Sequence, residues 1–132
     1  MKSVVISRHA LLDAQQQALQ DLGAEVIEIC EQYDPDRDNT RWKEQGVEAV
    51  FTVALPPNLL ARLSESFRVF TFEMESVGMA ESEEQAEAWC AQSPATRSYL
   101  PAREGSLRLL EFRSVSEIQI QIQTTRVWEV KP

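Results

Sequence analysis

The chain has 132 residues, of which 43% are hydrophobic and 26% charged, a composition typical of one soluble domain that buries its own core. Its net charge of −8 argues against a surface for long DNA or RNA, although a small anion can still bind in a local pocket. No apolar stretch approaches the roughly 20 residues that cross a bilayer, and the residues after Met1 do not resemble a secretory signal. Cys30 and Cys90 match no metal-binding spacing, so we expect reduced thiols in a cytoplasmic protein. From the length of the chain we expect a single domain over residues 1–132.

Short apolar runs alternate with helical stretches over the first two thirds of the chain. The expected strands are Lys2–Ile6, Glu25–Cys30, Val47–Val53 and Arg68–Phe72. Near-continuous apolar strands that are separated by helices indicate a parallel sheet with both faces covered. The expected fold class is therefore α/β, with a mostly parallel sheet flanked by helices.

Capping residues and helix breakers set the expected helix boundaries. Asp13 and Gln16 have the spacing of an N-terminal capping box, and Gly23 is placed to end that helix in the left-handed conformation. The polar segment 33–39 is expected to be a loop, followed by a short helix over 40–45. Two further helices are expected, one from Pro56 and Pro57 through Leu60, Leu63 and Phe67, and one over 80–91.

The last third of the chain changes character. Leu107–Phe112 and Ile118–Val130 contain no helical signal. In the second segment Ile118, Ile120 and Ile122 alternate with Gln119, Gln121 and Gln123, and Trp128 and Val130 keep the phase. Alternation of this kind indicates a half-buried, C-terminal antiparallel strand pair with one polar face.

The triplet Ser7-Arg8-His9 follows the first strand directly and contains the only histidine of the chain. Ligands of open α/β sheets bind at the carboxyl ends of the strands. The guanidinium of Arg8 suits phosphate, and the imidazole of His9 can transfer a proton. The loops after the first, third and fourth strands converge at this edge, and their candidate ligand-binding residues are Ser7, Thr52, Leu55, Asn58, Thr71 and Glu73.

Each of these residues also has a structural explanation. Ser7 can satisfy its own backbone, and the two threonines can simply be strand residues. Arg8 can be a surface charge that pairs with Glu73 or Glu75, two carboxylates that point to opposite faces of their strand. The sequence has no glycine-rich dinucleotide or Walker loop, no nucleophile elbow and no zinc-ligand set, so we expect neither a metal nor a cofactor.

The first strand, the triplet Ser7-Arg8-His9 and the glutamine-rich helix start Leu11–Gln17 together resemble the opening of small CRISPR-associated Rossmann-fold proteins of the minimal CARF type. The resemblance covers residues 3–76 and continues through Val50–Pro56 and Val69–Glu73. It implies a Rossmann-like, CARF-like fold. It also implies a homodimer that binds a cyclic oligoadenylate, the second messenger of type III CRISPR systems, across its two-fold axis.

The function implied by this resemblance is a ring nuclease of antiviral defence that cleaves cyclic tetra-adenylate. A ribose 2′-hydroxyl attacks the adjacent phosphorus without a metal and leaves linear products with cyclic 2′,3′-phosphate ends. As catalytic residues, Arg8 would stabilise the charge on phosphorus and His9 would transfer a proton. Two alternatives stay open: a non-catalytic binder of the messenger that acts as a sponge or regulator, and an unrelated α/β domain whose glutamine face meets another protein.

Overall fold

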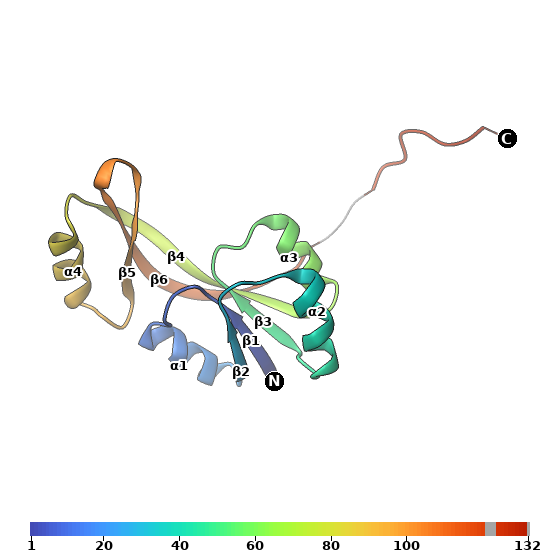
Figure 1. The fold of residues 1–132 in the computed structure, drawn as a ribbon, viewed down its shortest axis with the longest axis horizontal. Coiled ribbons are helices and arrows are strands. Elements are labelled where there is room, and N and C mark those ends of the chain that lie inside the picture. The colour runs from blue at the N-terminus through green and yellow to red at the C-terminus, as the bar shows by residue number, and fades with distance from the viewer. Residues whose placement is uncertain (121–123, 132) are drawn as a thin grey trace.

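The computed structural model describes residues 1–120 and 124–131, and within them the chain forms one mixed sheet and four α-helices (Figure 1). The elements are β1 (Lys2–Ile6), α1 (Asp13–Asp21), β2 (Glu25–Cys30), α2 (Pro35–Glu44), β3 (Ala49–Thr52), α3 (Pro57–Ser64), β4 (Arg68–Ala80), α4 (Glu83–Ala91), β5 (Arg97–Pro101) and β6 (Leu107–Ile118). A single 3-10 turn over Arg103–Gly105 precedes β6. The α/β class expected from the sequence is confirmed.

The strands of the sheet lie in the order β2-β1-β3-β4-β6-β5. The first four of these strands run parallel to one another, as alternating strands and helices predict. β6 runs antiparallel to β4 on one side and to β5 on the other. The sheet is therefore parallel in one half and antiparallel in the other, and the antiparallel half is larger than the sequence indicates.

Helices cover both faces of the parallel half. The layer against α2 and α3 contains Val4, Ile6, Val50, Val69, Trp42, Leu63 and Phe67. The layer against α1 contains Val5, Ala49, Phe51, Phe70, Phe72 and Leu19. Val4 and Val5 point to opposite faces and are both completely buried, which explains why β1 is a continuous apolar run.

The strand β4 has 13 residues and ends at Ala80, whereas the sequence predicts an end at Phe72. The added part carries exposed polar residues, among them Glu73 and Glu75, so it lacks the apolar run that identifies a buried strand. β4 includes Ala80, the first residue of the helix predicted over 80–91, and α4 begins later, at Glu83. There Ser82 caps the helix by accepting a hydrogen bond from a backbone N–H.

The extended part of β4 pairs with β6, and β6 pairs with β5, so that three antiparallel strands project from the parallel half. We call this unit the distal arm, which consists of Met74–Ala80, Arg97–Pro101 and Leu107–Phe112. α4 packs on one face of the arm (left in Figure 1), where Ala86 contacts Ala80 and Leu107. β5 is a strand that the sequence did not indicate.

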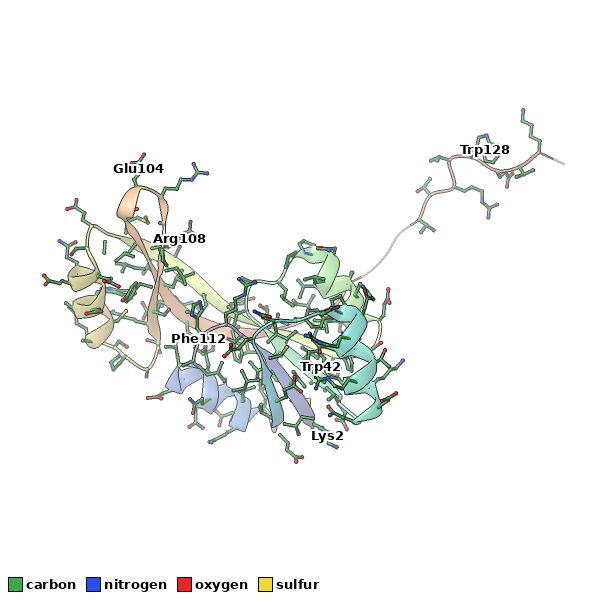
Figure 2. The ribbon with its side chains drawn as sticks, in the orientation of Figure 1. Lys2, Trp42, Glu104, Arg108, Phe112 and Trp128 are labelled. Carbon is green, nitrogen blue, oxygen red and sulfur yellow. The ribbon has the colours of Figure 1, made fainter. Side chains whose placement is uncertain are left out.

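The predicted second strand of the C-terminal pair is wrong in the residues that the structure describes. β6 ends at Ile118, and neither residues 119–120 nor residues 124–130 are in a strand; Gln121, Ile122 and Gln123 lie outside the described residues. The partner of Leu107–Phe112 is instead the extension of β4. Val127, Trp128 (labelled in Figure 2) and Val130 are 92%, 76% and 78% exposed, because no strand is paired with them.

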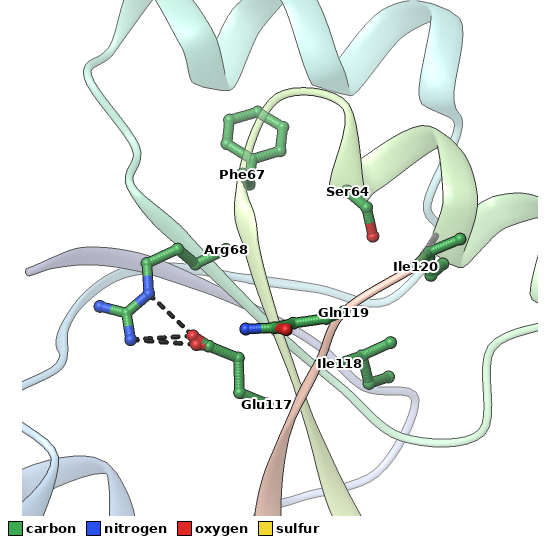
Figure 3. A pocket seen from close by; sticks show the side chains of 7 residues that line it. All are labelled: Ser64, Phe67, Arg68, Glu117, Ile118, Gln119 and Ile120. Atoms are coloured by element: carbon green, nitrogen blue, oxygen red, sulfur yellow. Dashed lines mark hydrogen bonds and ion pairs between the residues drawn. The ribbon is translucent and has the colours of Figure 1, made fainter. Parts of the chain in front are cut away.

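A groove of about 280 Å³ lies where β6 ends, beside the start of β4 (Figure 3). Its charged residues neutralise each other, since the Arg68 guanidinium donates to both carboxylate oxygens of Glu117 at 2.9 and 3.1 Å. Gln119 and Ile120 line the same groove. Among the described residues that line this groove, Arg68 and Glu117 are the charged ones, and their ion pair leaves no free charge for an anionic ligand.

The helix α2 begins at Pro35, so the loop predicted over 33–39 is wrong. Asp34 caps the helix, because its carboxylate accepts from the Asp36 N–H at 3.0 Å, and proline suits the first helical turn. The predicted inward position of Trp42 is confirmed, since this side chain is completely buried. Proline and aspartate are common in loops, but the same residues also start helices.

The capping box predicted for Asp13 and Gln16 is wrong, because α1 begins at Asp13 and its N-cap residue is Leu12, whose side chain cannot accept a hydrogen bond. Only the reciprocal half of such a box forms, in which the Leu12 N–H donates to Gln15 Oε1 at 2.9 Å. The predicted end of the helix is confirmed, because Gly23 has a φ of +73°, in the left-handed region that glycine adopts without strain.

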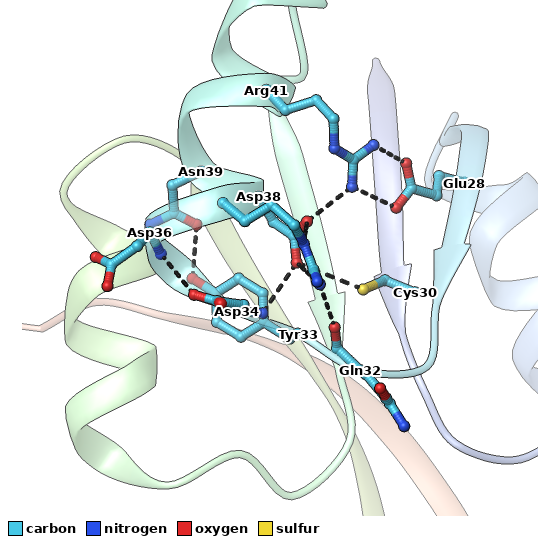
Figure 4. Close-up of polar contacts among 10 residues, drawn as sticks. Glu28, Cys30, Gln32, Tyr33, Asp34, Asp36, Asp38, Asn39 and Arg41 are labelled. Atoms are coloured by element: carbon cyan, nitrogen blue, oxygen red, sulfur yellow. Dashed lines mark hydrogen bonds and ion pairs between the residues drawn. The ribbon is translucent and has the colours of Figure 1, made fainter.

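A buried carboxylate fastens α2 to the end of β2 (Figure 4). Asp38 is completely inaccessible and accepts from Arg37 Nε at 3.0 Å, Arg41 Nη2 at 2.8 Å and the Asp34 N–H at 2.9 Å. Arg41 also donates hydrogen bonds to both carboxylate oxygens of Glu28 on β2. Burial favours the neutral form of Asp38, but the hydrogen bonds outweigh it and hold the pKa of Asp38 well below its ordinary value of 3.8.

We expect Asp38→Asn to lower the free energy of unfolding at pH 7 by about 3 kcal/mol, because it leaves two arginines without their buried counter-charge. Since the pKa of Asp38 is lowered on folding, its stabilisation is present above the unfolded value of 3.8 and is lost as the pH falls below it. Urea unfolding between about pH 5 and pH 3 should therefore show a steeper loss for the wild type than for the variant.

The control for this prediction is Asp36→Asn, whose carboxylate is 82% exposed and pairs with Arg62 at the surface. This substitution should cost less than about 1 kcal/mol. Equal effects of the two substitutions would contradict the assigned role of Asp38.

Candidate functional site

A cleft of about 490 Å³ opens at the carboxyl ends of β1 and β3. The loop after β1 contributes Ser7, Arg8 and His9, and the loop after β3 contributes Val53–Pro56. A second hollow, lined by Arg8, Glu31, Gln32 and Tyr33, adjoins it and shares three of its lining residues. The cleft is therefore formed by loops from separate parts of the sequence.

The strand order explains why a cleft forms at this place. From β1 the chain crosses to β2 on one side, and from β2 it returns past β1 to β3 on the other side. The loops after β1 and β3 consequently lead away from each other, α1 onto one face and α3 onto the other. Such a reversal of strand order leaves a crevice at the carboxyl edge, where open α/β sheets bind ligands.

The Ser7-Arg8-His9 loop is held by its own serine. Ser7 is buried, and its Oγ donates to the His9 carbonyl at 2.8 Å and accepts from the His9 N–H at 3.2 Å. The side chains of Arg8 and His9 are exposed to the cleft. Arg8 forms no ion pair with any residue in the described part of the chain, and Glu75, one of the partners considered for it, binds Arg113 instead.

The opposite wall of the cleft is apolar and contains a strained residue. Leu55, Pro56 and Leu59 line it, and Leu100 reaches it from β5 because the sheet curls. Ala54 has a φ of +53°, a left-handed conformation that costs a residue with a Cβ roughly 1–2 kcal/mol. Strained backbone of this kind gathers at functional sites, and here it lies in the lining of the cleft.

Tyr33 forms the floor between the cleft and the core. Its ring stacks on Trp42 with centroids 5.6 Å apart, and its hydroxyl donates to Asn39 Oδ1 at 2.6 Å. Burial raises the pKa of Tyr33 to about 12, so it stays neutral and offers a flat apolar surface. Because α2 carries Trp42 and Asn39, the Asp38 network also fixes this floor.

The structure brings together only part of the predicted ligand-binding set. Ser7, Arg8, His9 and Leu55 line the cleft, and Asn58 is exposed in the first turn of α3 outside the lining. Thr52 is buried and donates to the Phe70 carbonyl at 3.2 Å. Thr71 lies within β4, and Glu73 accepts from Ser116 and Ser114, two hydrogen bonds that lower the pKa of its carboxyl.

Three lining residues come from parts of the chain to which the sequence analysis assigns no part of the site. Glu31 and Tyr33 follow the carboxyl end of β2, so the rule that ligands bind at the carboxyl ends of parallel strands also points to them. Leu100 belongs to β5 and reaches the cleft only through the curl of the sheet. No local sequence signal marks a contact of that kind.

Taken together, the cleft offers one free guanidinium, one imidazole, the carboxylate of Glu31 and an apolar wall. A guanidinium beside a flat apolar surface suits a ligand that has both a phosphate and a planar ring. Within the described residues, no three histidine, cysteine, aspartate or glutamate side chains gather as a metal site. Among the same residues no helix is long and apolar enough to span a bilayer.

No protein-family model, curated protein or solved structure matches this chain.

The strain at Ala54 gives a prediction for stability. We expect Ala54→Gly to raise the free energy of unfolding by about 0.5–1 kcal/mol, because glycine adopts a positive φ without the Cβ clash, whereas Ala54→Val should lower it by about 2 kcal/mol. The matched control is Ala88→Gly on the exposed side of α4, which should cost about 1 kcal/mol because its backbone is helical. Urea unfolding measures all three, and destabilisation by Ala54→Gly would contradict a strained loop.

Proposed function

We propose that the cleft binds a nucleotide ligand through its phosphate, and that this ligand is cyclic tetra-adenylate, whose ring the protein opens. The observation that carries the proposal is the unpaired Arg8 beside His9 in a cleft with an apolar wall, at the reversal of strand order. The resemblance of residues 3–76 to minimal CARF proteins supplies the identity of the ligand. The parallel strand order β2-β1-β3-β4 supports a Rossmann-like, CARF-like description of this half of the fold.

The proposed reaction is an internal transfer at phosphorus. The 2′-oxygen of one ribose attacks the adjacent phosphorus, the bond from phosphorus to the 5′-oxygen breaks, and a cyclic 2′,3′-phosphate and a free 5′-hydroxyl result. His9 takes the proton from the attacking hydroxyl and returns one to the leaving 5′-oxygen. Arg8 stabilises the extra negative charge on the phosphate oxygens during the transfer.

The proposed active form is a cytoplasmic homodimer, in which two copies of the cleft face one cyclic ligand. Each subunit has a net charge of −8, so the ligand needs cations that are not already neutralised. Two copies of Arg8 at one axis provide them. The polyanionic ligand would be held locally even though the general field of the protein is repulsive.

A second candidate function is a binder that does not cleave. It is favoured by the hydrogen bonds of the His9 region, which engage only the backbone of His9 and leave the imidazole without an orienting partner among the described residues. A catalytic histidine usually has one ring nitrogen fixed by a carboxylate or carbonyl. In this alternative Arg8 holds the phosphate as before, and the ligand leaves unchanged.

Substitutions in the triplet separate the two candidates. We expect Arg8→Ala to weaken the binding of cyclic tetra-adenylate at least about 10-fold, because a charge-assisted contact to phosphate is lost. His9→Ala should leave the Kd within about 3-fold but slow the formation of cyclic phosphate ends in EDTA about 100-fold. Calorimetry and chromatography of the products measure the two effects.

Arg126→Ala is the control, since Arg126 is exposed, pairs with Glu129 and lines neither the cleft nor the adjoining hollow. Binding by the wild type without any turnover would favour the non-catalytic candidate. If the wild type does not bind at all, the proposed function is wrong.

A further inference from the structure

One face of the distal arm is left open, and a row of three residues crosses it next to the cleft. Leu100 on β5 lies directly opposite Arg108 on β6, and Arg108 lies directly opposite Met79 on β4. Directly opposed residues of antiparallel strands point to the same face, with Cβ atoms about 5 Å apart. α4 packs on the other face, against Ala80 and Leu107, so this row is not covered by the helix.

The row is continuous with the cleft through one residue that they share. Leu100 lines the cleft and is also the cross-strand neighbour of Arg108. Arg108 is exposed, and the Met79 side chain beyond it is 56% exposed. Figure 2 labels Arg108 on the arm, between the turn at Glu104 and Phe112. Leu100 is therefore the link between the cleft and the open face of the arm.

In the part of the chain that the structure describes, Arg108 has no acidic partner, which is unusual for an arginine of this acidic protein. Acidic partners hold the arginines at positions 37, 41, 62, 68, 97, 113 and 126. Arg8, Arg103 and Arg108 form no ion pair with the described residues. Arg8 lines the same cleft as Leu100, and Arg108 lies opposite Leu100 on the neighbouring strand, whereas Arg103 lies in the turn at the tip of the arm.

Hydroxyl groups lie in the next row of the same face. Ser98 on β5 and Ser76 on β4 both lie opposite Leu110 on β6. The open face therefore combines apolar side chains, one free guanidinium and two hydroxyls. Apolar contact with a base, stacking by a guanidinium and hydrogen bonds to ribose are the contacts that hold single-stranded nucleotides on a sheet.

We infer that the row Leu100-Arg108-Met79 is a second nucleotide subsite, which extends the cleft along the distal arm. The inference rests on the proposed function and deepens it. The cleft holds one nucleotide at Arg8, and the arm holds the neighbouring nucleotide, with Arg108 on its phosphate or over its base. A ligand of several linked nucleotides uses both subsites, and a mononucleotide uses the cleft alone.

The test compares cyclic tetra-adenylate with 5′-AMP as titrants for the full chain. Arg108→Ala should weaken the binding of cyclic tetra-adenylate about 10-fold and leave the binding of 5′-AMP within about 2-fold, because only the larger ligand reaches Arg108. Arg8→Ala should weaken both ligands. The matched control is Arg103→Ala, which removes an equally unpaired charge from the tip of the arm and should change neither affinity by more than about 2-fold.

The outcomes separate the two proposals. If Arg108→Ala binds cyclic tetra-adenylate as the wild type does, or loses both ligands equally, the second subsite is wrong and the proposed function stands. If Arg103→Ala weakens binding as much as Arg108→Ala, general charge explains the effect and the subsite is again wrong. If the wild type binds neither titrant, both proposals fall. Thermal unfolding of each variant verifies that the arm stays folded.

Discussion

The reversal of strand order between β1 and β3 is the constraint on which the rest of the structure depends. β1 lies between β2 and β3, and β4 lies beyond β3, so the chain leaves β1 toward one side of the sheet and leaves β3 toward the other. The loops that follow these two strands have to separate, because each leads to a helix on a different face. A crevice then opens at the carboxyl edge whatever its side chains are, and the residues at the strand ends decide what it binds.

The distribution of charge makes one part of this edge different from the rest of the surface. The buried carboxylate of Asp38 draws in Arg37 and Arg41, and most other arginines have acidic partners too. The cations that stay free include Arg8 in the cleft and Arg108 on the adjoining face of the arm. An acidic protein can hold an anion where its few unpaired guanidinium groups lie together, and the apolar wall adds contact for the rest of the ligand.

The sequence predicts the parallel half of the fold well, because its central strands β1 and β3 are buried on both faces and appear as continuous apolar runs. The same logic places Ser7-Arg8-His9 at the ligand-binding edge. The antiparallel half is not predicted correctly, because β4 continues through exposed residues such as Glu73 and Glu75, which lack the pattern of a buried strand. Their cross-strand partners are on β6. The contribution of Leu100 to the cleft depends on the curl of the sheet, so tertiary structure alone provides it.

The most direct measurement of the central claim is to locate the ligand by the backbone amide chemical shifts of the assigned protein during titration with cyclic tetra-adenylate. The account predicts that the largest changes fall on residues 7–9, 31–33 and 54–56, with a second group on the open face of the distal arm. The account would be contradicted if the shift changes were confined to the groove at the end of β6, or if no shifts changed at the highest ligand concentration of the titration.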